Sequence, residues 1–377
     1  MIGDSGFGNN NKEHSFSIKL VQMLHLDPLL LMGILLLSTA GLVVLYSAGD
    51  QSMSLINKQI TRLFLAFIIM LILAHVSPTA LRFWSPWIYS IGIILLILVL
   101  TVGDMGKGAQ RWLDLGFVRF QPSEMMKLAT PMMLAWYFSD KPLPPRFKHL
   151  LVAAVLLLLP TLLIAKQPDL GTALIIFAAG FLVVFLAGLS WRIMVFLGIS
   201  GAALLPVLWH YMHDYQRNRV LTFLNPESDP LGTGYHIIQS KIAIGSGGIY
   251  GRGWLNGSQS HLDFLPEQST DFIFAVFAEE FGLIGGMFLL ALYIFIILRG
   301  LVIAVQAQDS YGRLLGGSIS VTFFVYLFVN VGMVSGILPV VGVPLPLISY
   351  GGTSMVTLMA SFGILMSINT HRRIWAR

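Results

Sequence analysis

Two kinds of residue are scarce in this sequence: cysteine is absent and charge is sparse. Without cysteine, the 377-residue chain can form neither disulfide bonds nor thiolate metal sites. Charged residues make up 11% of the chain, whereas soluble globular proteins carry about 25%. So little charge cannot cover the surface of a soluble body of this size. Soluble enzymes, nucleic-acid-binding domains and secreted disulfide scaffolds are therefore excluded, and the nine histidines show no metal-ligand spacing.

Long apolar stretches are abundant instead, since 56% of the residues are hydrophobic. A transmembrane helix needs roughly 20 mostly apolar residues. Ten stretches approach this length: 29–48, 60–76, 83–103, 121–139, 149–166, 170–188, 192–212, 271–298, 314–338 and 345–368. The sequence therefore predicts an all-α integral membrane protein with about ten transmembrane helices. We expect a cytoplasmic or interfacial segment over residues 1–26, one membrane domain over 27–370 and a cytoplasmic tail over 371–377.

The distribution of lysine and arginine predicts the orientation of these spans. An even number of spans places both termini on one side, and the short loops on that side hold roughly twice as many basic residues as those opposite. Both termini are therefore predicted to be cytoplasmic, and the formal net charge of +5 needs no nucleic-acid partner. The outer loops, to which Arg62 is assigned, hold a basic group that breaks the rule: Lys107, Arg111 and Arg119. We expect that group to be retained for binding an anionic ligand.

Two long segments between the predicted spans are not apolar. Residues 104–120 mix charge, glycine and a tryptophan, and residues 214–270 form a large loop between the seventh and eighth spans. Loops longer than about 15 residues are usually functional or disordered. Because the large loop holds several aromatic residues, we expect it to be ordered against the membrane domain. Its glycine-rich stretch 245–253 follows no predicted strand, so its likeness to a phosphate-binding loop has little weight.

Asp271 lies directly before the strongly apolar run of the eighth span and has two interpretations. Aspartate is a good N-cap, so Asp271 and the adjacent Thr270 are consistent with a simple helix start. Alternatively, Asp271 is a general base at the membrane–water boundary. Glu267, four residues upstream, would then be its partner or a second carboxylate. The residue pattern alone leaves both interpretations open.

Glu279 and Glu280 lie deeper in the same span. At 100° per residue, a helix rotates Glu279 by about 80° and Glu280 by about 180° from Asp271. The two glutamates therefore cannot both face the same cavity as Asp271. We predict that at least one of them is a structural charge paired with another helix.

Glu124 and Lys127 are three residues apart in the fourth span and so share a helical face. Either they neutralise each other inside the bundle, or Lys127 joins Arg111 and Arg119 in an anion-binding patch. A pyrophosphate is the anion that best suits several cations beside apolar walls.

Three weaker candidates also have two interpretations each. Asp169, with the neighbouring Gln167, is either the cap of the sixth span or part of a polar cluster at membrane depth. Lys241 falls on a predicted helical turn of the large loop, where a solvated face is the simpler alternative to a ligand contact. Ser349 lies in a stretch of prolines and glycines, 339–352, of a kind tolerated at membrane depth where backbone lines a cavity. Its hydroxyl either contacts a ligand or packs, and packing is the simpler interpretation.

Several ordered motifs together resemble the SEDS family (shape, elongation, division and sporulation). The most specific are GAQRWLDLG at 108–116, RFQPSEMMK at 119–127, QPDLGT at 167–172, DPLGTGYHIIQSKIAIGSGG at 229–248, LPEQSTDFIFAVFAEEFGL at 265–283 and MVSGILPVVGVPLPLISYGG at 333–352. The resemblance extends from about residue 27 to residue 373. Its first and last motifs are more similar to the elongation branch of the family than to the division branch.

This resemblance implies ten spans, cytoplasmic termini and a large extracytoplasmic loop between the seventh and eighth spans, in agreement with the predictions from the residues. SEDS proteins polymerise the glycan strands of peptidoglycan from lipid II, with a class B penicillin-binding protein that supplies the transpeptidase. By resemblance, the essential aspartate of the family's TDF motif falls on Asp271, the tryptophan of RWLDLG on Trp112, and the charged pair on Glu124 and Lys127. Many relatives have histidine where this chain has Ser269, which weakens any mechanism that needs an imidazole there.

The resemblance thus implies an inverting glycosyl transfer at the periplasmic face of the bacterial inner membrane, during cell elongation and rod-shape maintenance. Asp271 would deprotonate the 4-hydroxyl of the GlcNAc of an acceptor lipid II, and that oxygen would attack C1 of the MurNAc of the donor glycan. Undecaprenyl pyrophosphate would leave, held by the basic cluster. A divalent cation, Mg²⁺ or Mn²⁺, that shares this task is kept as a hypothesis, because the sequence shows no dedicated carboxylate cage.

The implied partners are lipid II, undecaprenyl-linked glycan, the class B penicillin-binding protein, other elongation-machinery proteins and the membrane. Asp271 is the expected catalytic residue, and no metal ligand is expected from the protein. The expected substrate contacts are Arg111, Trp112, Arg119, Glu124, Lys127, Gln167, Asp169, Lys241, Glu267, Thr270 and Ser349.

Two rival functions stay open. A lipid II flippase or other transporter would also suit ten spans, broken helices and buried charges, but the candidate base lies at a membrane boundary and the largest polar apparatus on one side. A scaffold that only positions the transpeptidase would leave the intramembrane charges unexplained, and it should tolerate Asp271→Asn. We therefore favour the polymerase.

Overall fold

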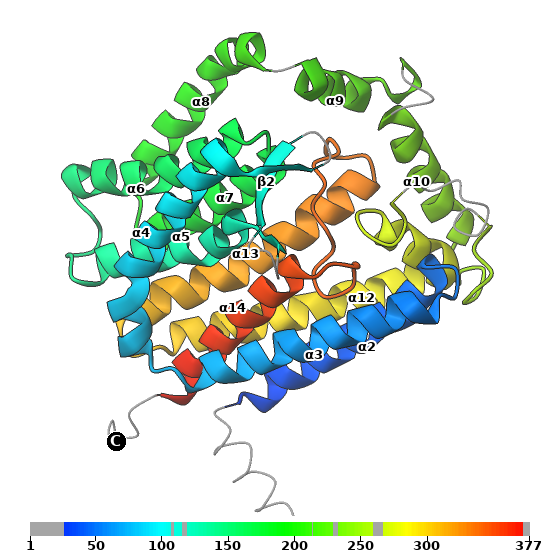
Figure 1. Ribbon diagram of the computed structural model, residues 1–377, viewed down its shortest axis with the longest axis horizontal. Helices are drawn as coiled ribbons and strands as arrows, with labels where there is room; N and C mark the ends of the chain where they lie inside the picture. Colours follow the sequence, from blue (N-terminus) through cyan, green and yellow to red (C-terminus); the bar gives the residue numbers. More distant parts are fainter. Residues whose placement is uncertain are drawn as a thin grey trace, which may run out of the picture.

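The computed structural model describes residues 26–106, 109–114, 119–212, 214–228, 233–258 and 267–371. Helices dominate this part of the chain, and each of the ten predicted spans overlaps one helix (Figure 1). In chain order these helices are α2 (Pro28–Ala48), α3 (Met53–His75), α4 (Pro78–Val102), α5 (Pro122–Ser139), α6 (Phe147–Lys166), α7 (Leu170–Leu186), α8 (Trp191–Tyr211), α12 (Ile273–Val305), α13 (Ser310–Val334) and α14 (Thr353–Thr370).

Seven helices in the described ranges are long and apolar enough to cross a membrane, judged by length and composition: α2, α3, α4, α6, α12, α13 and α14. Helix α7 and the first part of α8 are apolar but shorter. The chain is thus an all-α, multi-pass membrane protein, as the sequence predicts. The count of ten spans and the side on which each loop lies stay predictions.

Helices α12, α13 and α14 form the centre of the bundle. Helix α13 packs against α5, α7 and α12, and α14 lies along α3 (Figure 1). Most residues of α13 and α14 are buried, whereas α3 and α6 turn most of their side chains outward, as lipid-facing helices do. The core therefore forms where the C-terminal third of the chain passes between the earlier helices.

Residues 104–120 contain a small antiparallel sheet that the residue pattern did not predict. Its order is β1-β2-β3, with β1 (Asp104–Gly106), β2 (Ala109–Asp114) and β3 (Arg119–Phe120). Successive side chains of a strand point to opposite faces, so Arg111 and Trp112 on β2 point apart. Lys107 of the predicted basic group lies outside the described residues.

The later part of the large loop packs against the bundle, as predicted, whereas residues 214–224 contact mainly the other helices of the loop. It contains α9 (Asp214–Leu224), the short helix η1 (Pro226–Ser228) and α10 (Thr233–Gly247). Helix α10 packs along α12. The His236 ring stacks on Phe272 with 5.7 Å between centroids, and Ser240 Oγ donates to Val334 O at 2.8 Å. The loop therefore touches the residue that follows Asp271.

Helix α12 is broken at Gly282, where φ is 64° and ψ is −163°. The glycine-rich stretch 247–253 fills this break, and Arg252 N donates to Glu279 O at 3.0 Å. A Cβ on Gly251 would stand 2.1 Å from a backbone oxygen of α12, so glycine is needed for this close approach. The loop thereby satisfies backbone groups that the break exposes, as the interior of a membrane protein requires.

The predicted start of the last span at residue 345 is wrong, because α14 begins at Thr353. Residues 335–352, called here the Pro/Gly segment, contain no helix. Pro344 and Pro346 lack the backbone N–H that a helix interior needs. The segment lies instead against the turn that precedes α12.

Candidate active site

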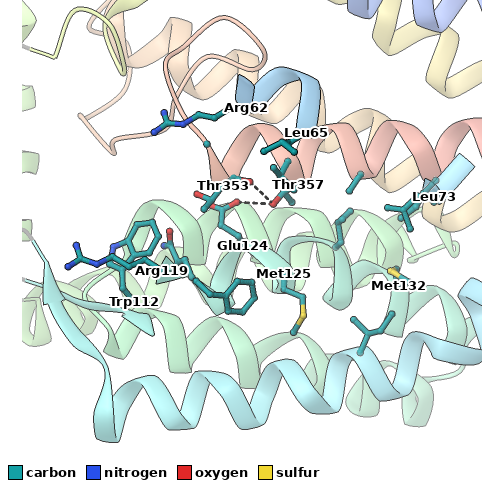
Figure 2. A pocket seen from close by; sticks show the side chains of 18 of the residues that line it. Arg62, Leu65, Leu73, Trp112, Arg119, Glu124, Met125, Met132, Thr353 and Thr357 are labelled. Atoms are coloured by element: carbon teal, nitrogen blue, oxygen red, sulfur yellow. Dashed lines mark hydrogen bonds between the residues drawn. The ribbon is translucent and has the colours of Figure 1, made fainter. Parts of the chain in front are cut away.

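Two cavities adjoin inside the bundle. The apolar cavity, of about 740 Å³, lies between α3, α4, α5 and α14 and is lined mostly by aliphatic and methionine side chains (Figure 2). The polar cavity, of about 250 Å³, lies between α5, α7, α13 and the Pro/Gly segment. Residues shared by both cavities form the wall between them: Gln121, Glu124, Gly352 and Thr353. A ligand with a long apolar chain and a charged head can therefore occupy both cavities at once.

The small sheet distributes three predicted site residues between the cavities. Arg111 lines the polar cavity and Trp112 the apolar one, because consecutive strand residues point to opposite faces. Arg119, on β3, lies beside Trp112 at the apolar cavity (Figure 2). Its side chain is mostly exposed, with Nε 3.8 Å from Asp114 Oδ2. The predicted single patch of Arg111, Arg119 and Lys127 is therefore divided between two cavities.

Glu124 and Lys127 on α5 form a buried ion pair, with 2.7 Å between Lys127 Nζ and Glu124 Oε1. The other carboxylate oxygen of Glu124 accepts from Thr357 Oγ1 at 3.2 Å (Figure 2). Lys127 Nζ also stands 5.6 Å from the centre of the Tyr326 ring. The predicted mutual neutralisation is confirmed, and both side chains also line the polar cavity.

Asp169 is both a cap and a member of a polar cluster. It caps α7, since its Oδ1 accepts from Thr172 N at 3.3 Å. It also lines the polar cavity, where it stands 3.7 Å from Arg111 Nη1 and accepts from Gln121 Nε2 at 3.3 Å. Two ion pairs therefore border the polar cavity, Glu124 with Lys127 and Asp169 with Arg111.

Asp271 lies in a turn, residues 267–272, directly before α12. The N-cap residue of α12 is Phe272, so the N-cap interpretation of Asp271 is wrong. Within the turn, Thr270 Oγ1 donates to Glu267 Oε2 at 2.8 Å. Glu267 thus helps to close the turn that carries Asp271, while its own side chain is exposed.

The Pro/Gly segment holds this turn in place. Ser349 Oγ donates to Thr270 O at 2.5 Å and accepts from Leu345 N at 2.8 Å. Tyr350 N donates to Ser269 O at 2.8 Å. The packing interpretation of Ser349 is thus the observed one, because its side chain is buried and both contacts are with backbone atoms.

The carboxylate of Asp271 lies next to Gly342, one of the residues that line the polar cavity. A Cβ on Gly342 would stand 3.4 Å from Asp271 Oδ2, and Gly342 and Val343 line that cavity. Gly342 adopts φ +74°, a conformation that costs glycine little. Asp271 therefore lies next to one residue of the polar cavity that Arg111 and Lys127 line, although the three come from distant segments.

Glu279 and Glu280 are both structural charges, and both are buried. Glu279 Oε1 accepts from Ser258 Oγ at 3.2 Å. Glu280 Oε1 accepts from Leu255 N at 3.1 Å and from Ser47 Oγ on α2. The prediction that at least one of them pairs with another helix is confirmed, and together they anchor the large loop to α12.

Five predicted substrate contacts are not among the residues that line either cavity: Gln167, Lys241, Glu267, Thr270 and Ser349. Gln167 is buried and donates from Nε2 to Leu96 O at 3.0 Å, which is a packing contact between α4 and the end of α6. Lys241 is exposed on α10 and covers Gly336, where a Cβ would stand 2.8 Å from Lys241 Nζ. Neither side chain joins the group formed by Asp271, Arg111 and Lys127.

Arg62 is a cation that the loop prediction misplaced. It lies inside α3, and its Cζ stands 4.5 Å from the centre of the Tyr350 ring. Its Nε lies 3.4 Å from the position of a Cβ on Gly352, so the guanidinium reaches the wall between the cavities (Figure 2). The signal in the sequence was an arginine beside a long apolar run, which by default indicates function.

Comparisons with known proteins place this geometry in a family. A family model of cell cycle proteins, FtsW, RodA and SpoVE, matches residues 20–374. The chain is 54% identical over 354 residues to the peptidoglycan glycosyltransferase MrdB of Escherichia coli K12, covering 94% of this chain and 96% of MrdB. It is 33% identical to the peptidoglycan glycosyltransferase RodA of Treponema pallidum, covering 92% of this chain and 98% of RodA.

Solved structures have the same fold. A chain from a structure described as the coordination of polymerization and crosslinking by a peptidoglycan synthase complex superposes with a TM-score of 0.80 at 31% identity, covering 92% of this chain and 99% of that one. The rod shape determining protein RodA of Thermus thermophilus superposes with a TM-score of 0.69 at 29% identity, covering 91% and 96%.

Proposed function

The chain belongs to the FtsW, RodA and SpoVE family, the SEDS proteins, and on that premise we propose that it is a peptidoglycan glycosyltransferase of the RodA type. It polymerises lipid II into β-1,4-linked glycan strands during cell elongation and rod-shape maintenance. The observation that carries the proposal is the position of Asp271 beside Gly342, which lines a polar cavity that adjoins a larger apolar one.

The two cavities suit a substrate that joins a polyprenyl chain to a diphosphate. The chain occupies the apolar cavity, beside Trp112 and Arg119. The diphosphate lies at the wall between the cavities, within reach of Arg62, Arg111 and Lys127. Hydrogen bonds from such cations to phosphate oxygens are roughly twice as strong as neutral ones. The diphosphate is therefore held by strong hydrogen bonds, and the polyprenyl chain by apolar contacts.

In the reaction, Asp271 takes the proton of the 4-hydroxyl of the GlcNAc of an acceptor lipid II. That oxygen attacks C1 of the MurNAc at the reducing end of the donor glycan. The bond from C1 to the diphosphate breaks with inversion, and undecaprenyl pyrophosphate leaves. Arg111 and Lys127 stabilise the charge that develops on the leaving group, which is usually the larger catalytic contribution. Thr270, Glu267 and Ser349 act on the turn that carries the base.

A divalent cation, Mg²⁺ or Mn²⁺, belongs to the proposal as an ion that binds together with the substrate. The described residues contain no group of three or more His, Cys, Asp or Glu side chains that could hold a metal. Glu124 and Asp169 are each paired with a cation of the protein. Magnesium is commonly held by one or two carboxylates together with substrate phosphates, so the polar cavity suits such an ion once a diphosphate occupies it.

The proposal includes location and partners. The chain works in the bacterial inner membrane with both termini cytoplasmic and the polar cavity facing the periplasm. A class B penicillin-binding protein supplies the transpeptidase, and other elongation-machinery proteins join them. The likeness to a chain from a peptidoglycan synthase complex supports a partner of this kind.

The test is glycan polymerisation from lipid II by the purified chain with its class B partner, comparing wild type with Asp271→Asn at equal folded yield. Long glycan from the wild type and none from the variant is the expected result. Equal polymer from both would remove Asp271 from the mechanism and direct attention to Glu267. No polymer from either, together with lipid II scrambling across vesicle membranes, would favour the flippase.

A further inference from the structure

Asn330 lies behind the Asp271 turn, near the C-terminal end of α13, and is fully buried. Its Nδ2 donates to Asp271 O at 2.9 Å and to Val343 O at 2.8 Å. Both acceptors are carbonyl oxygens, so the side-chain amide must present its NH₂ group to them. Both N–H bonds of that amide therefore join the turn to the Pro/Gly segment.

These two hydrogen bonds connect the candidate base to the surface on which its carboxylate lies. Val343 follows Gly342, and a Cβ on Gly342 would stand 3.4 Å from Asp271 Oδ2. If the turn moved relative to Val343, the carboxylate would move relative to the cavity that holds Arg111. Asn330 thus ties the backbone of Asp271 to the segment beside which its carboxylate lies.

The surroundings of Asn330 Oδ1 indicate that Asn330 has more than a packing role. Asn330 Oδ1 is buried and has no hydrogen-bond partner among the described residues. A buried carbonyl oxygen without a partner reduces stability, and an apolar side chain of similar size would not incur that loss. An amide at this position is therefore explained by what its NH₂ group holds.

We propose that Asn330 is a positioning residue for the glycosyl transfer, holding the Asp271 carboxylate beside Gly342 of the polar cavity by tying Asp271 O to Val343 O. The inference rests on the proposed function, because it takes Asp271 as the base. Asn330 acts through Asp271 and not by contact with substrate, since it is fully buried. Catalytic groups must be held within about 0.5 Å of their productive geometry.

The experiment compares Asn330→Leu with Asn369→Leu in the purified complex with the class B partner and lipid II. Leucine at 330 keeps the volume and removes both donations, so kcat per folded molecule should fall about 100-fold, as for a misplacement of about 1 Å. KM should stay close to wild type, whereas the thermal unfolding temperature should fall because two backbone carbonyls lose their donor. Asn369 Nδ2 donates to Asp27 Oδ2 at 2.8 Å, far from the site, so its loss should lower the unfolding temperature and leave kcat unchanged.

An unchanged kcat in Asn330→Leu, or an equal loss of kcat in Asn369→Leu, would overturn the inference. Asn330→Ser covers the case in which leucine prevents folding: it keeps one donor on a shorter side chain, so a wild-type kcat there would also overturn it.

The inference and the proposed function fail in different ways. If Asp271→Asn is inactive while Asn330→Leu has a normal kcat, Asn330 loses its role and the proposed function stands. If Asp271→Asn polymerises lipid II normally, the proposed base is wrong and Asn330 has nothing to position.

Discussion

The two ends of α12 hold similar groups in different surroundings. Near its C-terminal end, Arg299 donates to both oxygens of Asp27, at 3.0 and 2.5 Å, and Asn369 Nδ2 donates to Asp27 at 2.8 Å. Near its N-terminal end, Asn330 bonds the backbone of Asp271 while the carboxylate lies beside a residue that lines the polar cavity. At the first site the hydrogen bonds reach the carboxylate of Asp27, and at the second Asn330 bonds the backbone of Asp271. Charge within the membrane is therefore a poor guide to function until the surroundings of the carboxylate are known.

The Glu124–Lys127 pair lies between these extremes. Its charges form an ion pair, like those of Asp27 and Arg299. However, Glu124 belongs to the wall between the cavities, and Lys127 lines the polar cavity. The comparison therefore predicts that the charges of Glu124 and Lys127 contribute both to stability and to activity. The same comparison ranks the substitutions below, from the largest expected effect to the smallest.

The strongest test exchanges one oxygen for nitrogen at each end of α12. Asp271→Asn should reduce polymerisation about 10³-fold, within the range for loss of a general base, without lowering the unfolding temperature. Asp27→Asn should destabilise the fold by about 3 kcal/mol, because Arg299 loses its carboxylate, and leave kcat per folded molecule unchanged. Lipid II polymerisation and thermal unfolding in detergent measure both. If Asp27→Asn lost activity per folded molecule, the distinction between the two ends would disappear.

Paired substitutions distinguish the contribution of the Glu124–Lys127 ion pair to stability from its contribution to activity. Lys127→Met should destabilise the fold by about 3 kcal/mol, since Glu124 is left buried without its cation. Adding Glu124→Gln should restore much of the stability but leave activity about 100-fold low, because the leaving group has lost a cation. In the matched double variant, Arg299→Met with Asp27→Asn, the stability should likewise recover, and the activity should stay at the wild-type level. Recovery of activity in Glu124→Gln/Lys127→Met would make that pair structural only.

Arg62 tests whether the wall between the cavities binds the substrate head group. Arg62→Leu should raise the KM for lipid II about tenfold, the loss expected for about 1.4 kcal/mol of charge-assisted binding, with kcat nearly unchanged. Arg82→Leu is the control, because Arg82 pairs with Asp140 at an exposed site, where an ion pair contributes little. Steady-state kinetics decide, and a KM equal to that of the control would exclude a binding role for Arg62.

The smallest expected effect comes from the second contact of the Asp271 turn. Ser349→Ala removes the bonds to Thr270 O and Leu345 N, so stability should fall by about 1 kcal/mol and kcat by a few-fold. Ser90→Ala is the control, since Ser90 Oγ bonds within its own helix at an exposed position. A kcat loss as large as that of Asn330→Leu would mean that Ser349, too, sets the position of the base.

The bundle was more predictable than the site. Every predicted span overlaps a helix because lipid leaves a buried backbone few alternatives to helix. The rotation argument for Glu279 and Glu280 assumed Asp271 on the same helix, whereas Asp271 lies in the turn before α12, although both glutamates are structural charges as at least one was predicted to be. The division of Arg111 and Trp112 between two cavities was beyond such rules, since it depends on a strand of six residues that carries no apolar run.

By itself the sequence determined the membrane class, the approximate helices and the motifs that contain Asp271, Glu124 and Lys127, because these follow from local composition and order. Only the tertiary structure decided that Gly342 faces the Asp271 carboxylate and that Asn330, 59 residues away, bonds its backbone. Hydrophobicity acts on each segment separately, so it can be read from the chain. The contact between a turn, a glycine and an amide exists only after all three segments have packed.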